Sequence, residues 1–405
     1  MNILLINHYA GNPEMGMEYR PYYMAREWRN MGHSVRIVCS SFSHLRYFNP
    51  ILKTSIFIET IENVEFCWIK TPKYIGNGIQ RVNNIIVFLI KLILYRKRIV
   101  TSFKPDIVIS SSTYPLDGVL VRWFMINKEV VHVHEIHDLW PLTLKLLGGY
   151  RSFNPFIALL QWSENFVLKN CDYLVSILPG TFPYLISHGL AEEKFIFIPN
   201  GFIELQQVID IPKEHSELLN RLKAQGKFIL LYAGGHNISN ALHFMVLAAE
   251  KISDPDIAIV FVGKGTEKQS LIKMAEDKML KNIFFLPPVS KNAIPELLKF
   301  SDCLYLGWSK SPLYEFGISP NKIFDYMIAS KPIIHSYSGS YDIVKSSGCG
   351  ITVQAENHEE IVRAIFEMKK KNPEELISLG RLGYQYVIRE NNYKILSDRF
   401  INLLK

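Results

Sequence analysis

Short apolar segments alternate with longer helical stretches along almost the whole chain, and this alternation happens twice. The first series of predicted strands is 2–7, 34–39, 64–70, 106–110, 130–134, 173–177 and 195–198. The second series follows a polar, charged stretch at about 203–226 and comprises 228–233, 257–262, 283–285, 303–306, 332–336 and 350–353. Strands separated by helices are typical of parallel sheets with crossover helices. We therefore predict an α/β protein of two Rossmann-like domains.

The length of the chain also favours two domains. A chain of 405 residues is longer than one ordinary hydrophobic core supports, and an even division gives domains of roughly 200 residues each. The polar stretch between the two strand series marks the boundary, so we expect a first domain over 1–203 and a second over 204–387. The last stretch, 373–405, is predicted to be helical with an interruption near 390–392.

Composition and cysteine usage indicate a folded protein from a reducing compartment. Hydrophobic residues make up 48% of the chain and charged residues 20%, which favours an ordered fold. The five cysteines form no CxxC pair, and no histidine cluster has metal-ligand spacing. We therefore expect reduced core thiols, no metal site and a cytoplasmic protein. The first seven residues are typical of a strand rather than of a secretion signal, which agrees with that location.

An apolar run at 85–95 is the longest in the chain and lies among basic residues. It is interrupted by Lys91 and is about half as long as a bilayer requires, so it cannot span a membrane. The cations around it are Arg81, Lys91, Arg96, Lys97 and Arg98. Two interpretations stay open: a helix at 81–98 in the surface of an anionic membrane, or a core helix with a basic outer face. The net charge of +7 suits an anionic membrane and would suit nucleic acid equally.

The segment 314–327, followed by a buried strand, carries the clearest functional pattern. A glycine-containing loop ends at a proline and opens a helix there. Free N–H groups at a helix N-terminus favour a bound phosphate. The candidate contacts at this terminus are Ser319, Pro320 and Asn321. Lys322 and Asp325 are one helical turn apart on one face, where the lysine can bind a diphosphate and the aspartate a ribose.

Two familiar nucleotide-binding patterns are absent from the first loop. A hydride-transfer enzyme needs GxGxxG after its first strand, and the loop there offers only Gly11 and Gly16. The spacing of those glycines matches the start of a P-loop, but Met17 and Glu18 occupy the positions of its lysine and hydroxyl residue. Redox chemistry with NAD and ATP hydrolysis are therefore not supported. His8 and the two glycines either serve tight turns or let a donor or acceptor phosphate approach the backbone.

Histidines gather around the predicted strand 130–134. His132 and His134 alternate with valines, and we interpret them as buried core residues. His137 follows the strand and lies beside Asp138, where an oriented imidazole can donate to a sugar hydroxyl or carbonyl group. We therefore take His137 as a candidate catalytic residue.

The loops after the strands of the second domain carry further candidates, because doubly wound sheets bind ligands at the carboxyl ends of their strands. Gly234 and Gly235 allow backbone N–H groups to meet a phosphate, and His236 or Asn237 can add a donor. Lys264 lies in a Gly-Lys-Gly turn after the next predicted strand.

Together these segments resemble the retaining glycosyltransferases of family 4. The segments that carry the resemblance are 198–201 (Ile-Pro-Asn-Gly), 262–265 (Val-Gly-Lys-Gly), 285–289 and 314–327. The string His-Asp-Leu-Trp-Pro at 137–141 adds to them. The string Ser-Pro-Asn-Lys-Ile-Phe-Asp-Tyr-Met is similar to one in a subgroup of transferases from bacterial surface-polysaccharide clusters, such as those for O-antigen and capsule.

The resemblance implies the GT-B fold, in which two Rossmann-like domains face each other across a cleft. The first domain is then the acceptor side, the second binds the nucleotide sugar, and a final helix at about 388–405 crosses back to the first. The resemblance also implies that His137 touches the donor sugar near C6 and that Lys322 lies on the diphosphate. Pro288 and Val289 then belong to the loop that holds the nucleobase.

The chain departs from the family pattern at two points. Typical members carry two glutamates separated by seven residues, and here the first position is Gly317 and the second is Asp325. Glu315, two residues earlier, is the candidate replacement for the first acid. An arginine and a lysine that usually follow the first strand of the second domain are also missing. Lys322 is then the main cation for the diphosphate.

The resemblance therefore predicts a retaining hexosyltransferase that uses a nucleoside-diphosphate sugar. UDP is the expected nucleotide, and an N-acetylated or deoxy sugar is a candidate. The expected acceptor is a lipid-linked oligosaccharide of bacterial surface-polysaccharide synthesis, such as lipopolysaccharide O-antigen, at the inner face of the cytoplasmic membrane. No metal cofactor and no nucleic-acid partner are expected. Two alternatives stay open: a UDP-sugar epimerase of the same fold, which needs no acceptor, and a nucleotide-binding homologue without catalysis.

Overall fold

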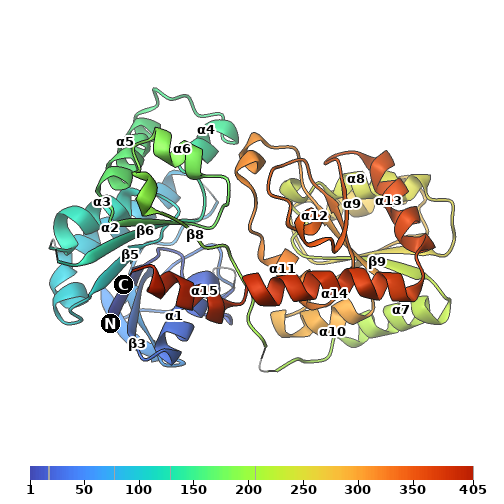
Figure 1. Ribbon diagram of the computed structural model, residues 1–405, viewed down its shortest axis with the longest axis horizontal. Coiled ribbons are helices and arrows are strands. Elements are labelled where there is room, and N and C mark those ends of the chain that lie inside the picture. The colour runs from blue at the N-terminus through green and yellow to red at the C-terminus, as the bar shows by residue number, and fades with distance from the viewer. Residues whose placement is uncertain (17–18, 77, 128, 206, 405) are drawn as a thin grey trace. The chain divides into compact units, whose positions relative to one another are not determined.

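Two α/β units make up the chain (Figure 1). The computed structural model describes residues 1–16, 19–76, 78–127, 129–205 and 207–404. The first unit comprises Met1–Asn200 and Tyr393–Lys405, and the second comprises Gly201–Asn392. The boundaries predicted from the sequence are 203 and about 388.

An eight-stranded sheet forms the centre of the first unit, in the order β3-β4-β2-β1-β5-β6-β7-β8. Its strands are β1 (Asn2–Ile6), β2 (Ser34–Ser40), β3 (Ile56–Ile61), β4 (Val64–Ile69), β5 (Ile107–Ser110), β6 (Val131–Ile136), β7 (Tyr173–Ser176) and β8 (Phe195–Phe197). Neighbouring strands are parallel except β3 and β4. Strand β3 was not predicted from the sequence. It forms an antiparallel edge hairpin with β4 through a tight turn at Glu62 and Asn63, which both have positive φ.

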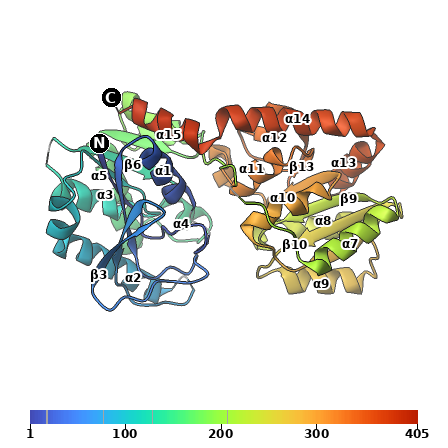
Figure 2. The ribbon, with the colours of Figure 1, turned by 90° about the horizontal axis from the view of Figure 1, so that it is seen from below.

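Helices cover both faces of this first sheet. They are α1 (Tyr19–Asn30), α2 (Ile79–Leu94), η1 (Lys97–Thr101), α3 (Leu116–Leu120), η2 (Val121–Met125), α4 (Leu142–Leu146), α5 (Pro155–Asn170), α6 (Phe182–Ser187), η3 (Glu192–Lys194) and α15 (Tyr393–Asn402). One core joins α2, η1, η2 and α5 to the sheet. On the opposite face α1 packs against α15 (Figure 2), where Trp28 donates its indole N–H to the carbonyl of Ser397 at 3.2 Å. The last helix of the chain is therefore part of the first unit.

The second unit has a six-stranded parallel sheet in the order β11-β10-β9-β12-β13-β14. Its strands are β9 (Phe228–Ala233), β10 (Ile257–Val262), β11 (Ile283–Leu286), β12 (Cys303–Gly307), β13 (Ile333–Ser336) and β14 (Gly350–Val353). Its helices are α7 (Lys213–Ala224), η4 (Ile238–Asn240), α8 (Leu242–Lys251), α9 (Lys268–Asp277), η5 (Lys291–Ala293), α10 (Ile294–Lys299), η6 (Pro312–Phe316), α11 (Asn321–Ile328), α12 (Ile343–Ser347), α13 (His358–Lys370) and α14 (Pro373–Glu390). Helices α7, α10, α11 and α14 cover one face, and α8, α9 and α13 cover the other (Figure 1).

The strand order reverses once in each sheet. In the second sheet the chain proceeds from β9 outward to β10 and β11 and then returns to the other side of β9 at β12. The loops after β9 and β12 therefore lead to opposite sides, and such switch points are where doubly wound sheets bind ligands. The corresponding position in the first sheet lies between β1 and β5.

All five cysteines are buried and free, in agreement with the predicted core thiols. Within the part of the chain that the structure describes, no helix has the length and apolar content needed to cross a bilayer. The predicted helical stretch at the end of the chain forms α14 and α15, which are interrupted at Asn391 and Asn392.

Candidate functional site

The predicted phosphate-binding loop leads to the switch point of the second sheet. Gly317 ends η6 with a φ of 85°, a left-handed conformation that favours glycine. Helix α11 then begins at Asn321 after Pro320, and no side chain caps its first turn. Its first backbone N–H groups therefore point toward the carboxyl ends of the strands without a capping side chain. Ser319 and Asn321 are half-buried at this terminus.

Lys322 reaches from α11 across the ends of β9 and β12. Its amino group donates to the hydroxyl of Tyr232 at 2.8 Å and to the side-chain oxygen of Asn240 at 2.7 Å. It also lies 5.7 Å from the ring centre of Trp308. None of the described carboxylates forms an ion pair with it, and burial lowers the pKa of Lys322 to about 7. A bound anion would supply the missing counter-charge.

The glycine loop after β9 passes directly beside this lysine. A Cβ on Gly234 would lie 3.0 Å from the amino nitrogen of Lys322, and the φ of Gly234 is 159°. The carbonyl of Gly235 accepts hydrogen bonds from the Tyr232 hydroxyl at 2.6 Å and from the Asn240 amide at 3.0 Å. Glycine at 234 therefore permits the close approach of backbone and cation, and the loop is held rigidly around them.

His236 is fully buried at the same place, and neither ring nitrogen has a hydrogen-bond partner among the described residues. Burial lowers its pKa to about 4, and the nearby cations Lys268 and Lys322 act in the same direction. The imidazole is therefore neutral and keeps one unused N–H donor and one unused acceptor. Buried polar groups are nearly always paired in folded proteins, so this histidine marks an incomplete polar site.

Asp325 is not bonded to Lys322, although both lie on α11. Its two carboxylate oxygens accept from the amino group of Lys291 at 2.5 and 2.6 Å. Lys291 opens η5, directly after the loop that contains Pro288 and Val289. The acid was expected beside Lys322, and its partner Lys291 was not predicted from the sequence. The ion pair therefore joins the predicted ribose-binding acid to the predicted nucleobase loop.

Two hydrogen bonds that were not predicted from the sequence hold the indole of Trp308 in place. The indole N–H of Trp308 donates to Nε2 of His335 at 3.1 Å, so the proton of this imidazole is on Nδ1. Nδ1 in turn donates to Asp342 at 2.9 Å. Burial alone would raise the pKa of Asp342, but His335, the Thr352 hydroxyl and the N–H of Lys345 together lower the pKa. Trp308 immediately follows β12, so its place after a strand was the available signal.

The remaining residues predicted for the second unit line its loops. Glu315 is exposed on η6. Lys264 is exposed after β10, and its carbonyl accepts the N–H of His236 at 2.9 Å. Pro288 is exposed and Val289 is half-buried, while His215 donates to the carbonyl of the preceding Pro287 at 2.8 Å and holds the loop in place.

In the first unit His137 belongs to a chain of charged groups. Its Nε2 lies 3.0 Å from a carboxylate oxygen of Glu135 and 2.9 Å from the hydroxyl of Ser111. Arg20 donates to the other oxygen of Glu135 at 2.8 and 2.9 Å. Burial alone would raise the pKa of Glu135, but Arg20 and His137 hold it well below its usual value. The chain Arg20, Glu135 and His137 therefore fixes the imidazole.

Glu135, and not Asp138, orients His137, which corrects the prediction from the sequence. Strand β6 continues to Ile136, beyond its predicted end, so residues 135 and 137 project from the same side. The carboxylate of Asp138 instead accepts from the Thr143 hydroxyl at 2.6 Å. Burial raises the pKa of Asp138.

The other polar residues of the first sheet have structural partners. His132 and His134 are buried and share the hydroxyl of Ser110, at 2.9 and 2.8 Å, as expected of core residues. His8 is enclosed by Tyr114 and Asn84, both at 2.7 Å. Gly16 has a φ of 111° and follows a turn at 13–15, and it pairs with Arg46 in an isolated antiparallel bridge.

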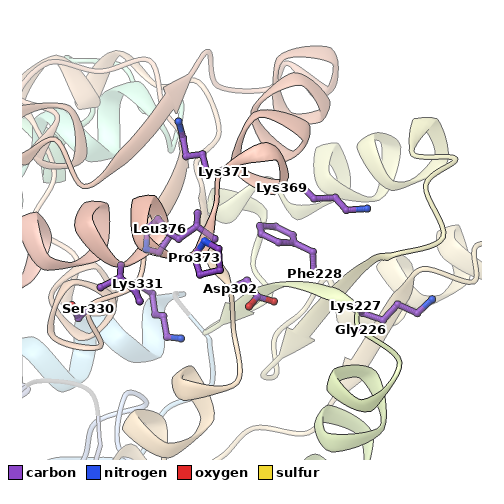
Figure 3. A pocket seen from close by; sticks show the side chains of 12 residues that line it. Gly226, Lys227, Phe228, Asp302, Ser330, Lys331, Lys369, Lys371, Pro373 and Leu376 are labelled. Carbon is purple, nitrogen blue, oxygen red and sulfur yellow. The ribbon is translucent and has the colours of Figure 1, made fainter.

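A cavity of about 450 Å³ lies at the other end of the strands of the second sheet, where β9, β12 and β13 begin (Figure 3). Lysines surround it, but their amino groups are bonded elsewhere. Lys331 donates to the carbonyl of Ser301 at 2.7 Å, and Lys369 pairs with Asp254 at 2.5 Å. The cavity lies where the strands begin, whereas doubly wound sheets bind ligands at the carboxyl ends of their strands, so we do not assign it to the nucleotide. Separately, the described residues contain no group of three His, Cys, Asp or Glu side chains that could hold a metal ion.

Two protein-family models match the chain. The model described as Glycosyltransferase Family 4 matches residues 15–203, and the model described as Glycosyl transferases group 1 matches residues 216–385. WcaI of Escherichia coli (strain K12), a glycosyl transferase assigned to colanic acid biosynthesis, is 34% identical over 179 residues. The aligned region covers 44% of this chain and 43% of WcaI, so the chain matches less than half the length of that relative.

Solved structures are similar over the full length. Sucrose-phosphate synthase from Thermosynechococcus elongatus has a TM-score of 0.74 at 16% identity, and covers 100% of this chain and 98% of its own. Anabaena HepE in complex with UDP and glucose has a TM-score of 0.67 at 14% identity, with 100% and 99% covered. WaaG, a glycosyltransferase involved in lipopolysaccharide biosynthesis, has a TM-score of 0.67 at 12% identity, with 98% of both covered. At these identities the likeness establishes a shared fold.

Proposed function

We propose that this chain, which belongs to the glycosyltransferases of the GT-B fold, transfers a sugar from a nucleoside diphosphate to an acceptor hydroxyl. The observation that carries the proposal is the buried amino group of Lys322, which lies at the switch point of the second sheet and has no carboxylate partner among the residues that the structure describes. The glycine loop and the unpaired imidazole of His236 surround the same position. A diphosphate would satisfy the cation and the donors together.

UDP is the nucleotide that we assign to this site. In the proposal, Lys322, the first N–H groups of α11 and the N–H of Gly235 bind the diphosphate, and Asp325 accepts from the ribose hydroxyls. The N–H of Gly234 already donates to the carbonyl of Val262 at 2.9 Å. The loop at 287–289, held by His215, holds the base through its backbone. Two lines of support are the resemblance of these loops to family 4 and the solved complexes of HepE with UDP and with UDP-glucose.

The proposed reaction proceeds with retention at the anomeric carbon. The bond from that carbon to the diphosphate oxygen breaks, and the acceptor oxygen forms its bond on the same face. The leaving diphosphate takes the proton of the acceptor hydroxyl. Negative charge grows on the departing oxygen, and a preorganised cation is most effective there. Lys322 supplies that charge, so the proposal does not require a metal ion.

The proposed acceptor is a lipid-linked saccharide of bacterial surface-polysaccharide synthesis, used at the cytoplasmic face of the membrane. Support comes from the assignment of WcaI to colanic acid biosynthesis and from the involvement of WaaG in lipopolysaccharide biosynthesis. The apolar, basic region around α2 is consistent with an acceptor that is delivered from a membrane.

A screen of UDP-sugars tests the proposal directly. We expect slow release of UDP from one or a few donors, and faster release when a lipid-linked acceptor is added. An epimerase would convert the UDP-sugar to a second UDP-sugar and release no UDP. An inactive homologue would bind UDP and release nothing from any donor. Either of these two results would replace the proposal by the corresponding alternative.

His137→Ala is expected to lower sugar transfer by about 10²-fold, the usual contribution of one positioned proton donor, with little change in UDP affinity. The reason is that Glu135 and Ser111 hold the imidazole within the first unit, whereas the groups assigned to the nucleotide belong to the second unit. Transfer rates and titration calorimetry with UDP measure the two effects separately. His132→Ala is the control, because that histidine is bonded within the core. Normal transfer by His137→Ala would make the residue structural.

A further inference from the structure

Helix α2 presents an apolar stripe to solvent, although its other side is part of the core. Ile86, Ile90 and Leu94 follow one another at four-residue spacing and are 48%, 50% and 70% exposed. The opposite side buries Phe88 and Leu92. The helix is therefore a core helix whose outer face is apolar. The basic outer face predicted for a core helix is therefore wrong, because the exposed side of α2 is apolar, and the membrane interpretation stays a prediction.

Exposed aromatic residues from η2 and α5 lie next to this stripe. The ring of Trp123 is 5.6 Å from that of Trp162 and 5.1 Å from that of Phe166. Trp123 is 53% exposed and Trp162 is 45% exposed. The side chain of Arg96, just after α2, donates to the carbonyl of Phe124 at 3.1 Å and joins the end of α2 to η2. This bond links the end of the stripe to η2, and both groups belong to the side of the first unit where α2, α3 and α5 lie (Figure 1).

This surface has a strongly basic border. Arg96, Lys97 and Arg98 are exposed at the end of α2. No Asp or Glu occurs in 66–105, 118–128 or 139–163, and Glu164 of α5 is buried. Lys91 is committed elsewhere, because it donates to the carbonyl of Lys70 at 2.7 Å. The charge around the apolar area is therefore of one sign.

We propose that this aromatic–basic face, defined by Ile86, Ile90, Leu94, Trp123, Trp162 and the cations Arg96 to Arg98, docks onto an anionic lipid bilayer. Indole rings favour the boundary between headgroups and acyl chains, and the cations pair with anionic headgroups. A second copy of the chain is a poorer occupant. In a two-fold interface both copies use the same surface. The three cations of one copy would then face the equally basic surface of the other, and like charges repel.

The face continues toward the carboxyl ends of the strands in the first sheet. Lys145 of α4 donates to the side chain of Gln161 of α5 at 2.6 Å, which joins the segment 142–153 to the aromatic residues. This segment exposes Leu147 and Phe153 and follows His137 closely in the chain. A lipid-linked acceptor on the docked membrane would thus reach the edge that carries His137. Only this last step rests on the proposed function; the docking itself does not.

Flotation of the full chain with vesicles tests the docking. We expect binding to vesicles of phosphatidylcholine with phosphatidylglycerol, weak binding to phosphatidylcholine alone, and weaker binding as salt is raised. Arg96→Gln, Lys97→Gln and Arg98→Gln together should weaken binding about fivefold for each cation removed. Trp123→Ser with Trp162→Ser should weaken it by at least about tenfold. Ile377→Ser on α14 is the control, because this residue is equally exposed in the second unit.

Vesicle binding does not require sugar transfer, so its failure is separate from failure of the proposed function. Equal binding to both vesicle types, or no binding by the wild-type chain, would overturn the docking. Wild-type behaviour of both sets of variants would do the same. Light scattering that shows a dimer, lost in the tryptophan variant, would assign the face to a second copy. Unchanged far-UV circular dichroism and an unchanged thermal unfolding temperature confirm that the variants are folded.

Discussion

Lys322→Met is expected to lower the turnover of sugar transfer by about 10²- to 10³-fold, which is the usual effect of removing one preorganised group that stabilises transition-state charge. Methionine keeps most of the length of the side chain and removes its charge. Tyr232 and Asn240 would lose a donor but stay bonded to the carbonyl of Gly235. The affinity for UDP should fall less than turnover, because the charge on the departing oxygen is greatest in the transition state. Single-turnover rates and titration calorimetry measure the two quantities.

The pH dependence of donor binding offers a second test of the same lysine. Its pKa of about 7 means that the empty site is largely neutral above pH 7. Binding an anionic diphosphate favours the charged form, so a proton is taken up and affinity falls as the pH rises above 7. A UDP-sugar is the suitable ligand, since its diphosphate does not titrate in this range. Lys322→Met should abolish this dependence.

Lys331→Met is the matched control for both measurements. Lys331 is also partly buried, its pKa is also lowered by burial, and it donates to the backbone carbonyl of Ser301. It lies beside the cavity at the opposite edge of the sheet. The role assigned to Lys322 is wrong if both lysine variants turn over sugar at the same rate. Retention of the pH dependence in Lys322→Met would have the same meaning.

The sheets could be predicted from the sequence because most strands are buried on both faces. Such strands are continuous apolar runs, as in β9 and β10, and their ends are marked by glycine and polar residues. Strand β3 was missed because it lies at an edge and mixes buried with exposed residues. Its hairpin turn at Glu62 and Asn63 was the available signal.

The candidate site was predictable only where its parts are close in sequence. The loop at 317–320, the start of α11 and Lys322 are consecutive, so local rules for helix ends located them. The groups that hold Lys322 are 82 and 90 residues away, in Asn240 and Tyr232. Their proximity is a consequence of strand order in the sheet, which single-residue patterns do not encode. The same limit applies to Glu135, since it was assigned to a loop although β6 includes it.

Asp325→Asn is expected to weaken UDP binding by about 10- to 100-fold, the range that corresponds to the loss of a hydrogen bond to a charged group. The side chain keeps its shape but loses its charge, and one acceptor oxygen becomes an N–H₂ donor. The carboxylate accepts from Lys291 through both oxygens, and each oxygen keeps a second lone pair for a ribose hydroxyl. Titration calorimetry with UDP gives the affinity, and thermal unfolding shows whether α11 is intact.

The matched control is Asp254→Asn. Asp254 pairs with Lys369 at 2.5 Å, and both ion pairs are about equally exposed. It lies before β10, at the amino ends of the strands, whereas the site lies at their carboxyl ends. Loss of the ion pair costs both variants a similar amount of stability, so only a ligand contact separates their UDP affinities. If the two variants bind UDP equally well, Asp325 serves only to hold Lys291.

Two further variants separate the contribution of Asp325 to UDP binding from that of Lys291. They are Lys291→Met and the double variant that combines it with Asp325→Asn. If Asp325 contacts ribose while Lys291 only holds it, Lys291→Met weakens UDP binding by a smaller factor than Asp325→Asn. The double variant should bind no worse than Asp325→Asn alone, because Lys291 acts through the acid, and such non-additivity is typical of residues in contact. Additive losses would instead mean that Lys291 contacts the nucleotide itself. In that case the cation of η5, together with Lys322, would replace the arginine and lysine that the loop after β9 lacks.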